Sequence, residues 1–410
     1  MKQKFPSSPR RIRALLGAAA VLATVPLVLT GCSGSGSASS GGSKALTIED
    51  YYDASYNPVY KQCAKDVGAT VTINHVAGAG LISKVLQQAS SKTLPDVLML
   101  DNPDVQQIAS SGALSDLSAY GLSASGDVPG VKAASTYKGK LYGVQSNTNS
   151  IALYYNKKLL SEAGVQPPKT WDELKAAAKK LTKGSTYGFA MSNINTYEGT
   201  WQFLPFFWSN GGDEKDIATP QAAQALQFVE DLQNDGSMSK SSISWAQADV
   251  NNQFLAGKAA MMINGPWQLP ALNAKKGLEF DSVPIPTRTG DAPVAPLGGE
   301  AFTVPQTGDK AKMQLAGKFV GCLHSVKGQE ALAKLSGNVP TNLEAGAKWA
   351  ESHPQVASFV TTVKTARART GELGPDWPKA ATKIYTAVQL ALTGKASPEA
   401  ALEQAQSQNQ

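Results

Sequence analysis

GKLYGVQSNTNSIALYYNKKLLSEAG, residues 139–164, is the stretch from which the rest of the chain can be understood. Its polar residues 145–150 are followed by an apolar run from Ile151 to Tyr155. A short run of apolar, β-branched and aromatic residues is typical of a buried strand. Asn156 is suited to cap the short helix that follows, and Gly164 to end it. The stretch therefore predicts a polar connection, a buried strand and a helix, in that order.

This pattern resembles the first crossover between the lobes of the extracellular solute-binding proteins that serve ABC importers, in the sugar-binding group that includes maltose-binding protein. The matching residues are Leu141 to Val144, Leu153 to Lys157, Ala163-Gly164, Pro167-Pro168 and Thr170 to Leu174. Gln145 stands where those sequences usually have proline. Similar matches occur at residues 94–117, 203–213, 254–267, 296–300, 339–341 and 397–402, so that the resemblance extends from residue 44 to about residue 404.

The resemblance implies a periplasmic-binding-protein-like α/β fold of two lobes, with three interlobe crossovers and a ligand cleft between the lobes. The residue patterns agree, because strands and helices alternate and a chain of 410 residues suits two lobes. We expect a signal peptide at residues 1–31, a Gly/Ser tether at 32–44, a first lobe of residues 45–147 and 301–341, and a second lobe of residues 148–300 and 342–410.

Local patterns also predict individual elements. Strands are expected at residues 46–52, 70–76, 94–101 and 259–263. Helices are expected at residues 57–67, 81–90, 246–256, 311–323, 327–335 and 170–183, the last with Thr170 as its N-cap and Gly184 as its C-cap. The strand at 94–101 is continuous in apolar residues, which predicts burial in a parallel sheet.

The first 32 residues have the pattern of an export signal. Basic residues precede an apolar run from Ala14 to Leu29, and Leu29-Thr30-Gly31-Cys32 resembles a bacterial lipobox. A membrane-spanning helix is the alternative, but the run is shorter than the roughly 20 residues that a span needs, and it contains Pro26. We expect lipidation at Cys32 and anchoring of the protein to the outer face of the cell membrane. Export can use either the general or the twin-arginine route.

The formal net charge is +6, but five positive charges lie within the first 31 residues, so that the exported chain carries about +1. This balance argues against the basic stripe of a nucleic-acid-binding protein. The arginines beyond residue 31 are Arg288, Arg367 and Arg369. Because phosphate and carboxylate sites usually use arginine, this scarcity favours a neutral ligand.

Cys63 and Cys322 remain when Cys32 is set aside for lipidation. In an exported protein two cysteines can form one disulfide, and the family resemblance places both in the first lobe. Two buried free thiols are the alternative.

The sequence shows little that would indicate an enzyme. Its three histidines, His75, His324 and His353, lack the spacing of a zinc site, and no Gly-x-Ser-x-Gly elbow, P-loop or calcium loop occurs. Asp101 and Asp104 have the residue types of a glycosidase pair, but a strand-end residue followed by a helix cap is the simpler interpretation. We therefore expect a protein that is not an enzyme and has no cofactor and no metal.

Reversible sugar binding fits the residues better. Aromatic rings match the C–H faces of a pyranose, and carboxylates and amides satisfy its hydroxyl groups. The family resemblance implies a ligand site made of residues of these types, namely Tyr52, Asp53, Asp101, Asn147, Glu198, Trp201, Trp245, Trp267, Glu300 and Trp377. Packing is the alternative for the tryptophans, helix capping for Asp101 and a hinge role for Glu300.

The resemblance thus implies a monomeric, extracellular substrate-binding lipoprotein of an ABC transporter, which captures a di- or oligosaccharide and delivers it to the membrane permease. A binding protein for a non-sugar solute such as a polyamine is one alternative. A carbohydrate-cleaving lipoprotein is another. No nucleic-acid partner is expected.

Overall fold

The computed structural model describes residues 44–408. The expected signal peptide, the lipidation site at Cys32 and almost all of the Gly/Ser tether lie outside the described residues.

The first lobe is built on a five-stranded sheet in the order β2-β1-β3-β13-β6. Its strands are β1 (Ala45–Asp50), β2 (Thr70–His75), β3 (Val97–Asp101), β6 (Val144–Gln145) and β13 (Glu300–Thr303). β1 runs parallel to β2 and β3, whereas β13 is antiparallel to β3 and β6. The sheet is therefore mixed rather than parallel, because the chain returns from the second lobe to add β13 beside β3.

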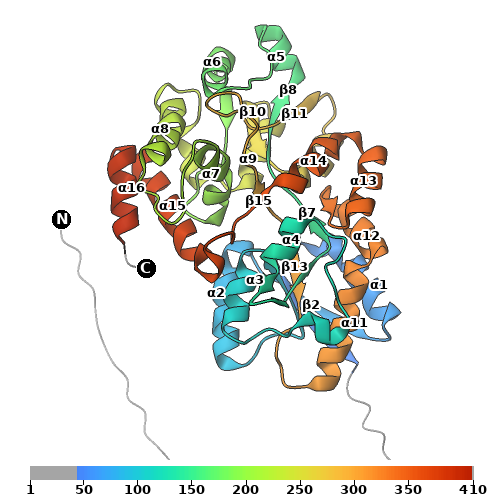
Figure 1. Cartoon of the computed structure of the whole chain (residues 1–410). Coiled ribbons are helices and arrows are strands. Elements are labelled where there is room, and N and C mark those ends of the chain that lie inside the picture. Colours follow the sequence, from blue (N-terminus) through green and yellow to red (C-terminus); the bar gives the residue numbers. More distant parts are fainter. Residues whose placement is uncertain (1–43, 409–410) are drawn as a thin grey trace, which may run out of the picture. The chain divides into compact units, whose positions relative to one another are not determined.

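Helices cover both faces of this sheet (Figure 1). Val97 and Met99 of β3 belong to one hydrophobic cluster, with α1 (Asn57–Asp66) and α11 (Lys310–His324). Leu98 and Leu100 belong to another, with α2 (Gly78–Ser91) and α3 (Asp104–Ser110). Successive strand residues point to opposite faces. A strand covered on both faces must be continuously apolar, which explains the composition of β3.

A disulfide joins Cys63 of α1 to Cys322 of α11, 259 residues apart in the sequence. α12 (Val326–Ser336) packs beside both helices. The bond therefore links the segment that precedes the first crossover to the segment that follows the second.

The second lobe contains a four-stranded sheet in the order β11-β8-β10-β9. Its strands are β8 (Ala152–Asn156), β9 (Tyr187–Ala190), β10 (Ala259–Asn264) and β11 (Phe280–Val283). β10 is parallel to β9 and antiparallel to β8. β8 is the strand predicted from residues 151–155.

The helix caps predicted around this strand are largely confirmed. The Asn156 side chain accepts a hydrogen bond from the Leu159 amide at the start of α5 (Lys157–Ala163), which ends at Gly164 with φ +59°. Thr170 and Glu173 form a capping box at the start of α6 (Trp171–Leu181). The predicted C-cap of α6 is wrong by two residues, because Thr182 rather than Gly184 ends the helix.

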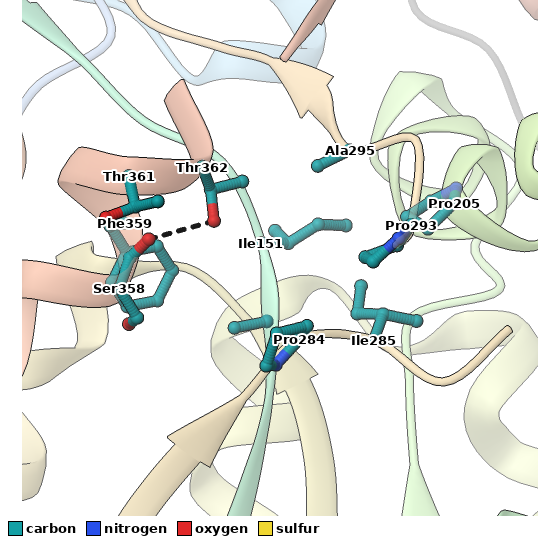
Figure 2. A pocket seen from close by; sticks show the side chains of 11 residues that line it. Ile151, Pro205, Pro284, Ile285, Pro293, Ala295, Ser358, Phe359, Thr361 and Thr362 are labelled. Carbon is teal, nitrogen blue, oxygen red and sulfur yellow. Dashed lines mark hydrogen bonds between the residues drawn. The ribbon is translucent and has the colours of Figure 1, made fainter. Parts of the chain in front are cut away.

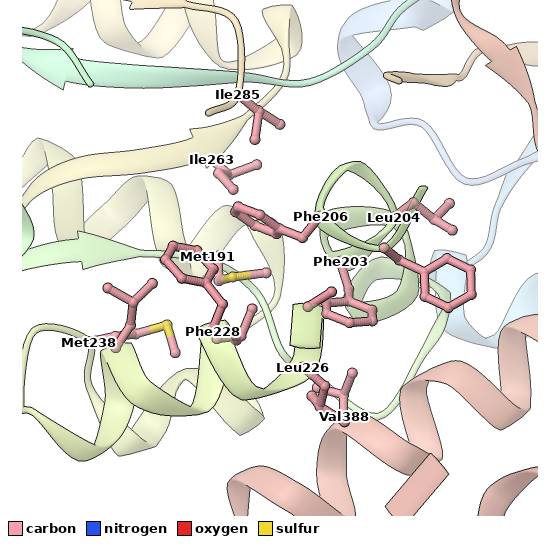
Figure 3. Packing of buried hydrophobic residues seen from close by; sticks show 14 of the residues in the cluster. Met191, Phe203, Leu204, Phe206, Leu226, Phe228, Met238, Ile263, Ile285 and Val388 are labelled. Atoms are coloured by element: carbon pink, nitrogen blue, oxygen red, sulfur yellow. The ribbon is translucent and has the colours of Figure 1, made fainter. Parts of the chain in front are cut away.

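The largest hydrophobic cluster lies on one face of the second sheet (Figure 3). Ile263 of β10 belongs to this cluster together with Phe203 and Phe206 of α7 (Tyr197–Ser209). This helix is buried along most of its length and contains Pro205. Other helices that contribute to this cluster are α5, α6, α8 (Pro220–Asn234), α15 (Trp377–Leu392) and α16 (Pro398–Ser407). Met262 points to the other face, where a second cluster includes residues of α9 (Gln247–Leu255), α10 (Leu269–Ala274), α13 (Leu343–Ser352) and α14 (Ala357–Thr365).

The three crossovers lie against one another at residues 145–150, 296–300 and 339–342. β7 (Asn147–Thr148) pairs with β14 (Val339–Pro340), and Asn149 bridges Gly298. The Thr148 and Ser150 hydroxyl groups donate to the carbonyl oxygens of Gly298 and Pro296, both at 2.8 Å. These short polar side chains satisfy buried backbone groups, which explains the composition of the first crossover.

Five short elements flank the crossovers. α4 (Pro129–Ala134) precedes a hairpin of β4 (Thr136–Tyr137) and β5 (Lys140–Leu141). β12 (Pro296–Leu297) pairs in parallel with β15 (Arg367–Ala368). This pairing brings the segment after α14 to the second crossover.

Within residues 44–408, no helix has both the length and the apolar character needed to cross a membrane.

Candidate functional site

Glu300, the first residue of β13, receives two tyrosine hydroxyl groups from the segment that follows β1. Tyr51 Oη donates to Oε1 at 2.9 Å, and Tyr52 Oη donates to Oε2 at 2.7 Å. Burial raises the pKa of Glu300, although the hydrogen bond from Tyr52 favours the charged form. Tyr52 also stacks on Tyr56, with ring centroids 4.0 Å apart. Glu300 thus orients an aromatic group beside the second crossover.

Asp101, at the carboxyl end of β3, is held by Arg369, which follows β15. Arg369 Nη1 donates to Oδ2 at 2.6 Å and Nη2 donates to Oδ1 at 2.5 Å. Nη2 also donates to Asn102 Oδ1 at 3.1 Å. A two-pronged contact of this kind is among the stronger and more specific hydrogen-bond geometries. It ties the first sheet to the segment that leads into α15 of the second lobe.

Trp201 of α7 packs against the same arginine. The Arg369 guanidinium lies 4.6 Å from the centre of the indole ring. A Cβ atom at Gly298 would lie 2.7 Å from Trp201 Cη2 and 2.1 Å from Asn149 Oδ1. Glycine is therefore required at this point of the second crossover. The indole is 6% exposed, so that Arg369 and the crossover already occupy the surroundings of the ring.

Asp104, the first residue of α3, lies in the same cluster. Asp104 is 6% exposed, and its Oδ1 has no hydrogen-bond partner among the described residues. Burial raises the pKa of Asp104, and the negative charge of Asp101 adds to the increase. The Asp104 charge in turn helps to raise the pKa of Tyr197 on α7, behind the larger effect of burial. Asp104 therefore lies where the two lobes meet.

Trp267 lies after the end of β10, in a short 3-10 helix, η4 (Pro266–Gln268). Its half-buried indole lies over Gly265, where a Cβ atom would be 2.0 Å from the ring. A Cβ atom at Gly337, which ends α12 with φ +72°, would be 2.5 Å from the Pro266 carbonyl oxygen. Trp267 therefore belongs to a turn that approaches the first lobe, and glycine is required on both sides of that approach.

The structure brings four of the ten candidate residues into one cluster, namely Tyr52, Asp101, Trp201 and Glu300. Three others have local contacts in the structure. Asp53 is exposed and caps a 3-10 turn, Glu198 accepts from the Gln247 amide at 2.7 Å, and half-buried Trp245 packs on the cluster around Met262. Trp267 stands apart in its turn.

Asn147 and Trp377 are both buried in the structure. Asn147 is 3% exposed and donates to the carbonyl oxygens of Ser146 and Gln329, so that its amide serves the first crossover. Trp377, the first residue of α15, is 1% exposed, and its ring packs near the ring of Trp208 on α7. The alternative of a packing role therefore describes Trp377 in this structure.

Sequence reasoning did not assign Tyr51, Asp104, Tyr197 or Arg369 to the site. Asp104 was interpreted as a helix cap, but no side chain caps α3, and Asp101 instead binds Arg369. The scarcity of arginine was the available signal. In this chain, Arg367 and Arg369 each pair with a buried or half-buried carboxylate and each lie over a tryptophan ring.

Two hollows open elsewhere on the second lobe, and neither is lined by a candidate residue. One, of about 290 Å³, is lined mainly by apolar side chains such as Ile151, Ile285 and Phe359 (Figure 2). The other, of about 620 Å³, shares Pro284, Ile285 and Pro293 with it. Each hollow also has a few polar side chains in its lining, namely Ser358, Thr361 and Thr362 in the first and Gln166, Lys169 and Asp291 in the second.

A family model described as a bacterial extracellular solute-binding protein matches residues 59–358. The chain belongs to this family. The curated relatives include a maltooligosaccharide ABC transporter solute-binding lipoprotein of Streptococcus pneumoniae, 27% identical over 84% of this chain and 83% of the relative.

Solved structures of solute-binding proteins share the fold. A protein of Thermotoga lettingae bound with α-D-tagatose is 26% identical and has a TM-score of 0.79, over 88% of this chain and 98% of that one. Maltose-bound MalE3 of T. maritima is 25% identical, with the same TM-score and the same coverage. The two-lobe solute-binding fold expected from residues 139–164 is thereby confirmed.

Proposed function

We propose that this solute-binding protein captures a di- or oligosaccharide outside the cell membrane and delivers it to an ABC permease. The observation that carries the proposal is the cluster of Tyr51, Tyr52 and Glu300 beside the crossovers. It offers rings and a carboxylate at the edge of the first sheet where β1 and β3 end and β13 begins, and α/β sheets bind ligands beyond the carboxyl ends of their parallel strands. The maltooligosaccharide-binding relative and the maltose-bound structure named above support the same ligand class, and the tagatose-bound structure supports a sugar ligand in general.

Uptake by intact cells tests delivery to the permease. Deleting the gene should abolish accumulation of labelled maltotriose at low external concentration, and a plasmid copy should restore it. Labelled glycerol serves as the control solute. Unchanged uptake of every di- and oligosaccharide tested would contradict the proposal, and release of shorter sugars by the purified protein would favour the carbohydrate-cleaving alternative.

Trp267 is proposed as a platform on which a sugar ring stacks. One face of an indole covers some 60–100 Å² of sugar, which contributes on the order of 1.5–2.5 kcal/mol at about 25 cal/mol per Å². Trp267→Ala should therefore weaken binding roughly ten- to sixtyfold, as measured by calorimetric titration. Trp267→Phe keeps an aromatic face and should lose much less. Equal affinity of the folded alanine variant would remove Trp267 from the site.

The lipid anchor is a separate proposal, carried by the Leu29-Thr30-Gly31-Cys32 pattern. Cys32→Ser should release the protein into the medium or the soluble fraction, because the thioether-linked lipid forms on that cysteine. Ser33→Ala keeps the cysteine and is the matched control. Membrane fractionation with immunoblotting measures the outcome. A Cys32→Ser variant that stays with the membranes, still carrying its signal, would support the spanning-helix alternative.

A further inference from the structure

The cluster at the meeting of the lobes contains more acid than base. Asp101, Asp104 and Glu300 contribute three carboxyl groups, and Arg369 contributes one guanidinium. Both terminal nitrogens of Arg369 are committed to Asp101 and Asn102. The Asp101–Arg369 pair is therefore neutral as a unit, and Arg369 has no terminal nitrogen left to pair with Asp104 or Glu300.

The remaining two acids differ in their partners. Glu300 accepts one tyrosine hydroxyl group on each of its oxygens, at 2.9 and 2.7 Å. Asp104 is more than nine-tenths buried, and its Oδ1 accepts no hydrogen bond from the described residues. A buried polar atom without a partner is unfavourable and rare in folded proteins. Asp104 is thus the acid of this cluster that lacks a donor.

The surroundings of Asp104 decide which donor would suit it. Asp104 interacts electrostatically with Asp101 from β3, Arg369 from the segment after β15 and Tyr197 from α7. Because Asp101 already neutralises Arg369, a positive group beside Asp104 would meet an excess of negative charge.

We propose that Asp104 selects a sugar that carries a protonated amino group. An ammonium group carries a positive charge and up to three N–H donors, and Asp104 Oδ1 has no hydrogen-bond donor among the described residues. A hydroxyl group carries only one neutral donor. Hydrogen bonds between two charged groups are roughly twice as strong as neutral ones. The inference rests on the proposed function, since it refines the ligand of the same site, and it replaces the neutral ligand expected from the sequence.

The experiment is calorimetric titration of the mature protein with maltotriose and with a set of maltotrioses in which one hydroxyl group is replaced by a primary amine. At least one amine should bind wild-type protein about tenfold or more tightly than maltotriose. Repeating the titration in buffers of different ionisation enthalpy should show proton release, because the ammonium favours the ionised form of Asp104.

Asp104→Asn should abolish both the amine preference and the proton release. Asp172→Asn is the matched control. Asp172 lies in the first turn of α6, as Asp104 lies in the first turn of α3, but Asp172 is exposed whereas Asp104 is buried. Asp172→Asn should keep the preference. Thermal unfolding establishes that both variants are folded.

Three outcomes overturn the inference. If maltotriose binds and no amine binds more tightly, the amine selection fails while sugar binding stands. If the preference survives Asp104→Asn, another residue carries it. If no sugar binds and spermidine does, the proposed function itself fails and the polyamine alternative replaces it.

Discussion

Replacing Arg369 by methionine should lower the free energy of unfolding by about 3 kcal/mol. Removing one partner of a buried ion pair typically costs 3–5 kcal/mol, because the other charge stays buried without compensation. We expect the lower end of this energy range, because the Asp101 side chain is 26% exposed to solvent. The loss of the contact with the Trp201 ring adds to the effect. Urea denaturation of both proteins measures the difference.

A double-mutant cycle separates the pair from general damage. Arg369→Met combined with Asp101→Asn should be less destabilised than the sum of the two single variants, because the orphaned charge is gone. Arg288→Met, at an exposed arginine, is the matched control and should change stability by less than about 0.5 kcal/mol. A loss below 1 kcal/mol for Arg369→Met, with no coupling to Asp101, would show that the ion pair does not stabilise the fold.

Loss of the Cys63–Cys322 disulfide should cost about 3–5 kcal/mol. The bond closes a loop of 259 residues, and the entropy removed from the unfolded chain grows with loop length. The double variant Cys63→Ser/Cys322→Ser avoids a lone thiol and should unfold at lower urea concentration than the oxidised protein. Ser substitution at both positions also makes the protein insensitive to reductant, which is the internal control.

The oxidised protein should lose the same stability when dithiothreitol is added. Equal unfolding midpoints with and without reductant would contradict the prediction. So would alkylation of both thiols in protein that is denatured but not reduced, because that result would favour the free-thiol alternative.

Local signals were enough to predict the elements whose ends are fixed by neighbouring residues. Asn156, Gly164 and Thr170 set the limits of α5 and the start of α6 through contacts within a few residues. α7 was not predicted, because Pro205 interrupts the pattern of a helix and its aromatic residues face the core on nearly all sides. Tertiary packing, rather than propensity, stabilises that helix.

The candidate site was harder to predict, because its contacts join distant parts of the chain. Tyr52 and Glu300 are 248 residues apart, and Asp101 and Arg369 are 268 apart. Family resemblance predicted Tyr52, Asp101 and Glu300 individually as site residues. It could not show that Arg369 would form an ion pair with Asp101. Burial, which distinguishes Trp377 in the core from the half-buried Trp267, depends on packing between helices that no local pattern reveals.

Sugar capture is the central claim, and a thermal-shift titration of the mature protein over a panel of di- and oligosaccharides tests it most directly. A ligand that binds only the folded state at a concentration 100 times its Kd stabilises that state by about 2.7 kcal/mol. We predict that at least one sugar raises the melting temperature in a saturable, concentration-dependent way, while sorbitol at equal concentration does not. A melting temperature that no sugar in the panel changes, in protein shown to be folded, would contradict the account.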